Sequence, residues 1–192
     1  MEKKTHEVRV FGEEATLTLM YFNKKDGREW KQLFDKWKDL KLGLREYGAR
    51  EPNMPEGLSE VAFCLWSGSG RFLSMSIKDR KIKVAKSFDT FNVKTQRAEQ
   101  IKATSIKEDL TSFGPKSRWD DLYFLDFYNQ GKLDGTFNVF LIPSKLIYEH
   151  KINKTQTFTE QQDQKRRPRL SLTKNFEKWK IKPIATNVKI WN

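Results

Sequence analysis

The sequence has few of the residues that build disulfides and zinc sites, and it has no long apolar segment. Its 192 residues include one cysteine and two histidines, which excludes an internal disulfide and leaves too few ligands for a zinc finger. No apolar run reaches the roughly 20 residues that span a membrane, and the opening segment MEKKTHEVRV lacks the apolar core of a signal peptide. We therefore expect a soluble, cytoplasmic protein with no membrane partner.

Acidic residues are outnumbered as well, and the resulting charge points to a polyanionic partner. The formal net charge is +12, and residues 151–192 carry eleven Lys or Arg against three acidic residues, so this segment alone supplies +8. Lys and Arg bind phosphates in part because they release condensed counterions. DNA, RNA and anionic membranes all fit this charge, and a solvated basic tail is the alternative.

An amphipathic helix is expected in the segment REWKQLFDKWKDLKLG, residues 28–43. Four apolar side chains recur there at helical spacing: Trp30, Phe34, Trp37 and Leu40. Asp26 and Glu29 fit a capping box at the start of this helix. We interpret the stripe as core or as a dimer contact rather than as a surface on which bases stack.

A second helix is expected to begin at Pro55, because proline suits the first helical position and an apolar stripe follows it. Glu60 lies on another face of this helix. Four later segments have the composition of strands: residues 82–93, 98–106, 122–128 and 136–142. Three short elements complete the pattern: a helix capped by Ser144, a strand in RLSL at residues 169–172 and a helix in TKNFEKWKI at residues 173–181.

This order, helices first and then a mixed sheet flanked by later helices, predicts an α/β or α+β fold. No repeat or low-complexity linker divides the chain. We expect a single domain over residues 1–192, with an N-terminal helical part over about residues 1–66. The catalytic and DNA-binding core is expected over about residues 67–192.

The segment SFDTFNVKTQRAEQIKATSI, residues 87–106, predicts a β-hairpin with one polar face. A turn centred between Thr95 and Gln96 would place Asp89 directly opposite Lys102, with their Cβ atoms roughly 4.5–5.5 Å apart. Because side chains alternate between the faces of a strand, Gln100 would share the face of Lys102. A register shift of one residue would break this arrangement.

These residue types suit the metal-assisted hydrolysis of a phosphodiester. Such a reaction needs a carboxylate that holds a hard divalent cation and a cationic group that orients water and offsets negative charge. Asp89 and Lys102 fit these two roles, and Glu60 is the candidate for a second carboxylate. The spacing alone is a weak signal, because an ordinary Asp–Lys surface pair gives the same pattern.

Longer motifs carry a resemblance to a known family. They include MPEGLSE with Glu60, SFDTF with Asp89, DGTFNVFLIP, LIYEHKIN and QQDQKRRPRLSL. The run DLTSFGPKS is the most specific of them, because composition alone hardly produces it. Together these blocks cover roughly residues 54–172, and there the chain resembles type II restriction endonucleases of the Bsp-six-I type, which cleave GCNGC.

The resemblance implies a PD-(D/E)XK nuclease core, in which a mixed β-sheet is flanked by helices. It also implies Mg²⁺ as the cofactor, double-stranded DNA as the substrate and a homodimer that acts on a G·C-rich near-palindrome. The implied activity is that of a type II site-specific deoxyribonuclease in a restriction-modification system. Such an enzyme hydrolyses DNA phosphodiesters, here at GCNGC, and leaves 5′-phosphate ends.

The catalytic pattern implied by the resemblance is Glu60, Asp89 and the run Gln100-Ile101-Lys102. Asp89 and the backbone carbonyl of Ile101 are expected to hold Mg²⁺, and Lys102 to position the attacking water. Gln100 departs from the pattern, because Asp or Glu is usual at this place. Its amide oxygen can ligate Mg²⁺ but brings no charge. Glu60 is therefore expected either to bind the metal or to support Gln100.

Basic residues toward the C-terminus are the candidates for DNA binding. The strongest direct contact to a G·C-rich site is a bidentate Arg to guanine O6 and N7. Four candidates lie in the segment QQDQKRRPRL: Gln162, Arg166, Arg167 and Arg169. For each arginine, base contact and phosphate contact both stay open. Lys116 and Arg118 are expected to contact phosphates, and Glu108 and Asp109 to cap their loop rather than to bind metal.

Two other functions fit parts of the sequence. The net charge alone suits a non-catalytic nucleic-acid-binding module, but such a module has no need of Asp89 beside Lys102, since a carboxylate near phosphates weakens binding. A repair or structure-selective nuclease with the same PD-(D/E)XK core is the second alternative. Only a restriction enzyme would cut plasmid DNA into discrete, sequence-defined fragments.

Overall fold

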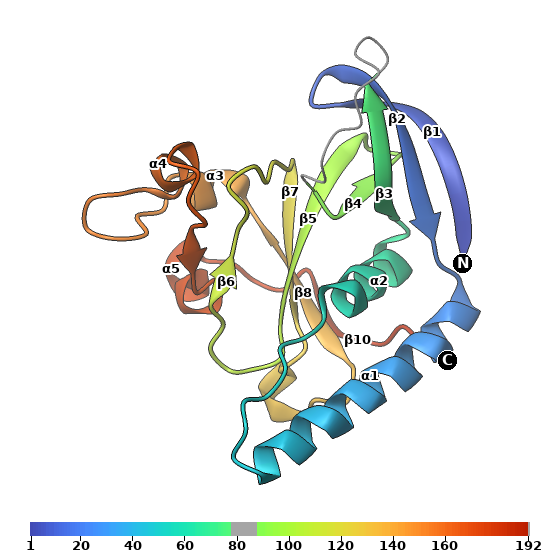
Figure 1. Ribbon diagram of the computed structural model, residues 1–192, viewed down its shortest axis with the longest axis vertical. Helices are drawn as coiled ribbons and strands as arrows, with labels where there is room; N and C mark the ends of the chain where they lie inside the picture. The colour runs from blue at the N-terminus through green and yellow to red at the C-terminus, as the bar shows by residue number, and fades with distance from the viewer. Residues whose placement is uncertain (78–87, 192) are drawn as a thin grey trace.

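The computed structural model describes residues 1–77 and 88–191. Within them, eight strands form one mixed sheet in the order β1-β2-β3-β4-β5-β7-β8-β10 (Figure 1). Neighbouring strands are antiparallel except for β5 and β7, which run parallel. The strands are β1 (Glu2–Val10), β2 (Glu13–Tyr21), β3 (Gly70–Ile77), β4 (Thr90–Asn92), β5 (Arg97–Thr104), β7 (Asp121–Asp126), β8 (Phe137–Ile142) and β10 (Ala185–Val188).

Two long helices, α1 (Lys24–Glu46) and α2 (Glu56–Ser67), pack against one face of the central strands. Trp30, Phe34 and Trp37 are buried there with Ile101 of β5 and Leu125 of β7. Burial of such large apolar side chains is the main force that holds α1 on the sheet. The expected helix and its aromatic stripe are confirmed.

Two details of α1 differ from expectation. Its N-cap is Asn23, whose side chain accepts a hydrogen bond from Asp26 N, while the Asp26 carboxylate accepts one from Asn23 N. Asp26 therefore occupies the N3 position of the capping box rather than the N-cap position, and the helix begins earlier than expected. Leu40 is largely exposed, so the buried stripe ends at Trp37. The helix α2 starts as expected, with Pro55 as its N-cap.

The opposite face of the sheet is covered by short elements from the C-terminal half. They are α3 (Ser144–Tyr148), α4 (Phe158–Asp163), α5 (Phe176–Trp179), the 3₁₀ helix Thr173–Asn175, and a small sheet of β6 (Thr111–Ser112) and β9 (Arg169–Leu170). Another 3₁₀ helix, Asn129–Gly131, follows β7, and the Asn129 side chain donates to Asn187 of β10. Phe113 and Phe158 pack there against Leu122 and Phe124 of β7. Because side chains alternate along β7, these residues face away from α1 and α2. The expected mixed sheet flanked by helices is confirmed.

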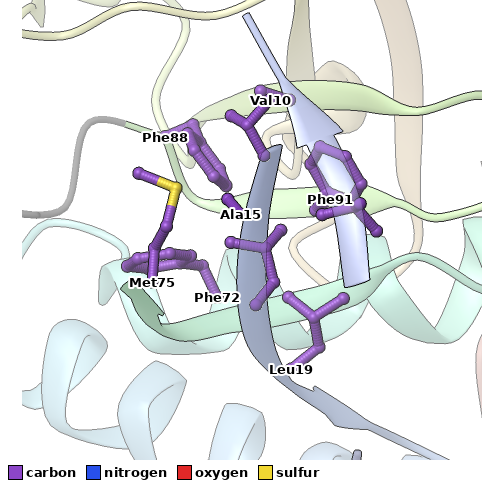
Figure 2. Close-up of a cluster of buried hydrophobic side chains, with 10 residues drawn as sticks. Val10, Ala15, Leu19, Phe72, Met75, Phe88 and Phe91 are labelled. Carbon is purple, nitrogen blue, oxygen red and sulfur yellow. The ribbon is translucent and has the colours of Figure 1, made fainter. Parts of the chain in front are cut away.

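The N-terminal hairpin β1–β2 corrects the expected order of elements. The first 21 residues, assigned to a helical part, form two strands that extend the sheet beyond β3. Ala15, Leu17 and Leu19 are buried while the threonines between them are not, which is the two-residue alternation of a strand. Figure 2 shows Ala15 and Leu19 packed with Phe72, Met75, Phe88 and Phe91 in the core beneath this hairpin.

Other expected elements are found with shifted ends. The strands expected at residues 98–106, 122–128 and 136–142 correspond to β5, β7 and β8. The strand expected at 82–93 is reduced to β4 in the described residues, and its part at 82–87 lies outside them. The N-cap of α3 is Pro143 rather than Ser144, whose hydroxyl instead donates to the backbone oxygen of Asp120. None of the helices in residues 1–77 and 88–191 combines the length and apolar character needed to cross a bilayer.

Candidate active site

The register of β4 and β5 places Asp89 beside Gln100. Thr90 pairs with Glu99, and the backbone N–H of Asp89 donates to the Glu99 carbonyl at 3.0 Å. The same register continued by one residue sets Asp89 opposite Gln100, so the expected pairing with Lys102 is wrong by two residues. Because the error is an even number, Asp89, Gln100 and Lys102 still share one face of the sheet.

The turn explains this difference in register. The side chain of Asn92 accepts hydrogen bonds from the backbone N–H groups of Lys94 and Thr95, at 3.1 and 3.2 Å. Such a side-chain bridge stabilises a tight turn, here centred between Lys94 and Thr95. The turn therefore closes one residue earlier than the expected centre between Thr95 and Gln96.

The Asp89 carboxylate is nearly buried and held by β5. One of its oxygens accepts hydrogen bonds from the Gln100 side-chain amide and, at 2.9 Å, from the backbone N–H of Ile101. The amide of Gln100 thus orients Asp89 in this arrangement. Its expected part as a direct metal ligand stays a prediction.

A cleft of about 340 Å³ brings most of the expected catalytic residues together, but Gln100 is not among the residues that line it. Glu60 from α2, Asp89 and Ile101 line it, and so do Lys102 and Arg167. The ammonium group of Lys102 lies 5.2 Å from the centre of the Phe113 ring, on the face opposite α2. The cleft therefore combines carboxylates, an amine and an arginine that are far apart in the sequence.

The donor atoms of this cleft suit a hard divalent cation. Carboxylate and backbone carbonyl oxygens are the ligands that Mg²⁺ prefers, and Glu60, Asp89 and Ile101 supply both kinds at one cleft. No cluster of three or more His, Cys, Asp or Glu side chains with the arrangement of a metal site occurs in the described part of the chain. A metal here would thus rely on two carboxylates, a carbonyl and water or substrate oxygens.

Arg71 is a contact of this site that sequence reasoning missed. Its Nε lies 2.5 Å from a Glu60 carboxylate oxygen, and the Glu60 side chain is only 3% exposed. Glu60 comes from α2 and Arg71 from β3, which neighbours β4. The segment SGSGR that contains Arg71 carries no motif of a catalytic site, and no local pattern signals a contact between a helix and a neighbouring strand.

Glu99 is a buried carboxyl on the other face of β5. It accepts a hydrogen bond of 2.8 Å from Thr90 Oγ1, and burial raises its pKa to about 7. The nearby thiol of Cys64 is buried in the core, and its pKa is raised by burial and by the charge of Glu99. Glu99 therefore faces α2 and not the cleft.

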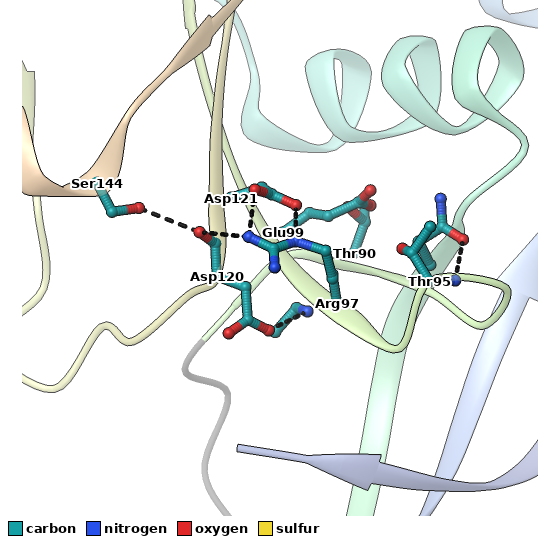
Figure 3. Close-up of polar contacts among 9 residues, drawn as sticks. Thr90, Thr95, Arg97, Glu99, Asp120, Asp121 and Ser144 are labelled. Atoms are coloured by element: carbon teal, nitrogen blue, oxygen red, sulfur yellow. Dashed lines mark hydrogen bonds and ion pairs between the residues drawn. The ribbon is translucent and has the colours of Figure 1, made fainter. Parts of the chain in front are cut away.

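The start of β5 is fastened to β7 by a group of polar contacts, shown in Figure 3. The Arg97 guanidinium binds the Asp121 carboxylate, with Nη2 2.6 Å from Oδ1, and also donates to the Asp120 carbonyl. The Asp120 carboxylate accepts from the backbone N–H of Ala98 at 2.8 Å. These contacts fix the position of β5 and hence of Gln100 to Lys102.

The arginines of the basic segment have different surroundings. Arg167 is exposed and lines the cleft, whereas Arg169 is exposed on β9 and is not among the residues that line it. Arg166 donates to the Gln156 side chain at 3.1 Å. The amide of Gln162 donates to the Gly114 carbonyl at 2.9 Å, so Gln162 supports the FGPKS turn.

The second basic cluster lies beside this turn. Lys116 is exposed, and the Arg118 guanidinium lies 4.3 Å from the centre of the Phe11 ring, at the tip of the N-terminal hairpin. Such a cation–π contact favours one position of the guanidinium. Arg118 therefore joins the hairpin β1–β2 to the loop before β7.

Asp109 ties the loop before β6 to the segment after β9. Its carboxylate accepts hydrogen bonds from the backbone N–H groups of Leu172 and Thr173 and from the hydroxyls of Thr111, Ser171 and Thr173. Glu108 pairs with Lys174 at 2.7 Å. These partners lie in β6 and after β9, so Asp109 holds that segment rather than capping the loop of Lys116 and Arg118 as expected.

Comparison with known proteins gives the family. The model of the family "Bsp6I restriction endonuclease" matches residues 22–178, so the hairpin β1–β2 and the strand β10 lie outside the matched range. The type II restriction enzyme Bsp6I of Bacillus sp. (strain RFL6) is 33% identical over 151 residues, which cover 78% of this chain and 80% of that protein. No solved structure matches this chain with significance. The chain therefore belongs to the Bsp6I family of type II restriction endonucleases, a class of site-specific endonucleases.

Proposed function

We propose that this chain cleaves double-stranded DNA at GCNGC in a Mg²⁺-dependent hydrolysis that leaves 5′-phosphate ends. One observation carries the proposal: a single cleft is lined by Asp89, Lys102 and Arg167. These residues supply a carboxylate for a cation, an amine beside the reacting phosphate and an arginine for DNA. A non-catalytic DNA-binding module has no use for the first two.

Two carboxylates and one carbonyl are the proposed holders of the cation. Asp89, Glu60 and the backbone carbonyl of Ile101 would bind Mg²⁺, with Gln100 holding Asp89 in place. When bound, the cation offsets the charge on the scissile phosphate and lowers the pKa of a coordinated water. Arg71 keeps the buried charge of Glu60 compensated, because an isolated buried carboxylate is strongly disfavoured.

Lys102 is the proposed catalytic amine. Its ammonium group orients the attacking water and stabilises the negative charge that grows on the phosphate oxygens. The ring of Phe113 beside it excludes water from one side of the side chain. Electrostatic stabilisation is stronger in such a partly desolvated place than in bulk water.

DNA would be held by the exposed basic residues around the cleft. Arg167 is the proposed base-reading or phosphate-holding residue nearest the chemistry, and Arg169 and Lys116 would contact the backbone farther out. Arg166 and Gln162 have protein partners and would support these residues through the loop that they brace. Arg118 would reach a phosphate from its position over Phe11.

A homodimer is proposed because the two strands of a near-palindrome present two equivalent phosphates. The α1 surface favours association, since Leu33, Leu40 and Tyr47 lie exposed at seven-residue intervals on one helix face. Sedimentation of the wild-type protein and of Leu40→Glu tests this. A dimer that dissociates in the variant supports the α1 surface, and a wild-type monomer on DNA rejects the dimer.

The proposed function is tested by digestion of DNA of known sequence with Mg²⁺, followed by sequencing of the ends. Discrete fragments that end within GCNGC and carry 5′-phosphates are the expected result. Cutting only at branched or damaged sites would instead identify a repair or structure-selective nuclease. DNA binding without cutting under either Mg²⁺ or Mn²⁺ would identify a non-catalytic module.

A further inference from the structure

Two large apolar side chains stand exposed on the lip of the polar cleft. Ile106 and Leu110 lie in the loop between β5 and β6, with 44% and 68% of their surface exposed. Both line the same cleft as Asp89 and Lys102. Exposed apolar residues scattered over a surface need no explanation, but a pair beside a catalytic cleft marks a surface that a ligand covers.

The loop that carries them is held firmly by hydrogen bonds. Thr104 Oγ1 donates to the Ile106 carbonyl at 3.0 Å and accepts from the Ile106 N–H at 3.2 Å. Leu110 follows Asp109, whose carboxylate accepts hydrogen bonds from Thr111 and from the segment after β9. The backbone therefore presents both side chains outward, where neither can turn into the core.

The charged side chains near Ile106 and Leu110 indicate which kind of ligand would cover these two residues. Lys107 and Glu108 stand exposed between the two residues in sequence, and Glu108 is neutralised by Lys174 at 2.7 Å. Arg167 lines the cleft together with Ile106 and Leu110. Cationic side chains around an apolar point match duplex DNA, in which charged phosphates border the apolar faces and edges of stacked bases. A purely apolar partner would instead leave these charges without counterparts.

We infer that Ile106 and Leu110 form an apolar wedge that enters a groove of the bound duplex next to the scissile phosphate. The wedge presses against a base step, loosens its stacking and holds the strand over Lys102. Proteins that insert apolar side chains between base steps bend DNA in this way. The inference rests on the proposed function, because it requires duplex DNA in the cleft.

The test compares Ile106→Ala/Leu110→Ala with the control Ile184→Ala. Ile184 is 53% exposed and is not among the residues that line the cleft. Duplex affinity is measured with Ca²⁺ over a range of salt concentrations, and stacking is followed by the fluorescence of 2-aminopurine placed within GCNGC. Thermal unfolding and sedimentation of each variant report on folding and on association.

We expect the double variant to unfold like the wild type, to bind the duplex about tenfold more weakly and to give a smaller fluorescence rise. Its salt slope should equal that of the wild type, because no phosphate contact is lost. If the double variant bound the duplex as tightly as the wild type and gave the same fluorescence rise, the wedge would be overturned. Cleavage at GCNGC by the wild-type protein would still support the proposed function. A change in oligomeric state with unaltered DNA binding would also overturn the wedge, since the pair would then contact a second copy.

Discussion

Two pairs of strands, β4–β5 and β6–β9, flank the cleft, which β5 and β6 line, and the pairs differ in the pKa of a buried carboxyl. In β4–β5, the carboxyl of Glu99 is buried with a hydrogen bond from Thr90, and burial raises its pKa to about 7. In β6–β9, burial acts in the same direction on Asp109, but hydrogen bonds from Thr173, Leu172 and Thr111 outweigh it and lower the pKa. Burial thus dominates the pKa of Glu99, whereas the hydrogen-bond donors together dominate the pKa of Asp109.

The two pairs of strands also differ in the roles proposed for them. The strands β4 and β5 position the side chains of the proposed chemistry, and a buried carboxyl there weakens the fold near neutral pH. The pair β6–β9 carries Arg169 and adjoins Arg167, and Asp109 joins the loop before β6 to the segment after β9, more than sixty residues later in the chain. The proposed chemistry and the proposed DNA contact thus lie on separate sheets, and Asp109 holds the smaller sheet together.

The largest expected effect is a loss of cleavage rate when the proposed catalytic carboxylate next to β4 is replaced. Asp89→Asn should lower the cleavage rate at least about 1,000-fold, roughly 4 kcal/mol, because the substitution removes the charge proposed to hold the cation. The amide oxygen can still accept from the Ile101 N–H, so the fold and Ca²⁺-supported DNA binding should persist. Cleavage rates are compared with those of Asp39→Asn, an exposed site on α1. Normal cutting by Asp89→Asn would show that the site is wrongly assigned.

The next effect concerns the carboxylate that holds the segments around β6 and β9 together. Asp109→Ala should lower the free energy of unfolding by about 3 kcal/mol, because it leaves buried N–H groups of Leu172 and Thr173 without an acceptor. Chemical denaturation measures this, with the exposed Asp163→Ala as control. Equal losses in both variants would mean that Asp109 does not stabilise the segments around β6 and β9.

Because its pKa is lowered, Asp109 should make the stability of the fold depend on pH. Its contribution to stability should be complete above the unfolded-state pKa of about 3.8 and should fall as the pH drops through the lower folded-state value. Asp109→Ala should therefore have a flatter stability curve below pH 4 than the wild type. Parallel curves would contradict the hydrogen-bonded charge.

Glu99 predicts the opposite dependence in the other region. Its folded-state pKa of about 7 exceeds the unfolded value of 4.5, so the stability it contributes is complete below pH 4.5 and is lost as the pH rises through 7. Glu99→Gln keeps an acceptor for Thr90 and should remove this loss, which amounts to roughly 3 kcal/mol. Unfolding of both proteins between pH 4 and 8, without metal, measures the difference. A constant offset between the two curves would show that Glu99 does not titrate there.

The sequence predicted the parts of this comparison that depend on local pattern. Alternation along 98–106 put Gln100 and Lys102 on one face and Ile101 on the other, and the structure agrees. The register of Asp89 was wrong because the Asn92 side chain, not the length of the loop, sets the turn.

The sequence did not predict the contacts between segments that are far apart along the chain. Arg71 meets Glu60 through the placement of α2 against β3, and Asp109 meets Leu172 through the pairing of β6 with β9. Neither contact leaves a periodic signal in the sequence. The N-terminal hairpin is a different case, because the alternating ATLTLMY did carry the signal of a strand and was overlooked.

The smallest expected effect separates the arginines of the basic segment. Arg167 lines the cleft, whereas Arg166 donates to Gln156 outside it. Arg167→Ala should weaken binding to GCNGC by roughly 1–3 kcal/mol, and should relax the preference for that site if the guanidinium reads a guanine. Arg166→Ala should have a smaller effect, because its partner belongs to the protein.

Salt dependence distinguishes the two parts that Arg167 could play. Loss of a phosphate contact lowers the slope of log K against log salt by about 0.9 and weakens binding to all sequences alike. Loss of a base contact leaves the slope nearly unchanged and weakens binding to GCNGC alone. If Arg166→Ala instead changed site preference more than Arg167→Ala, base reading would lie away from the catalytic cleft, and the two sheets would not share the bound duplex in the way proposed.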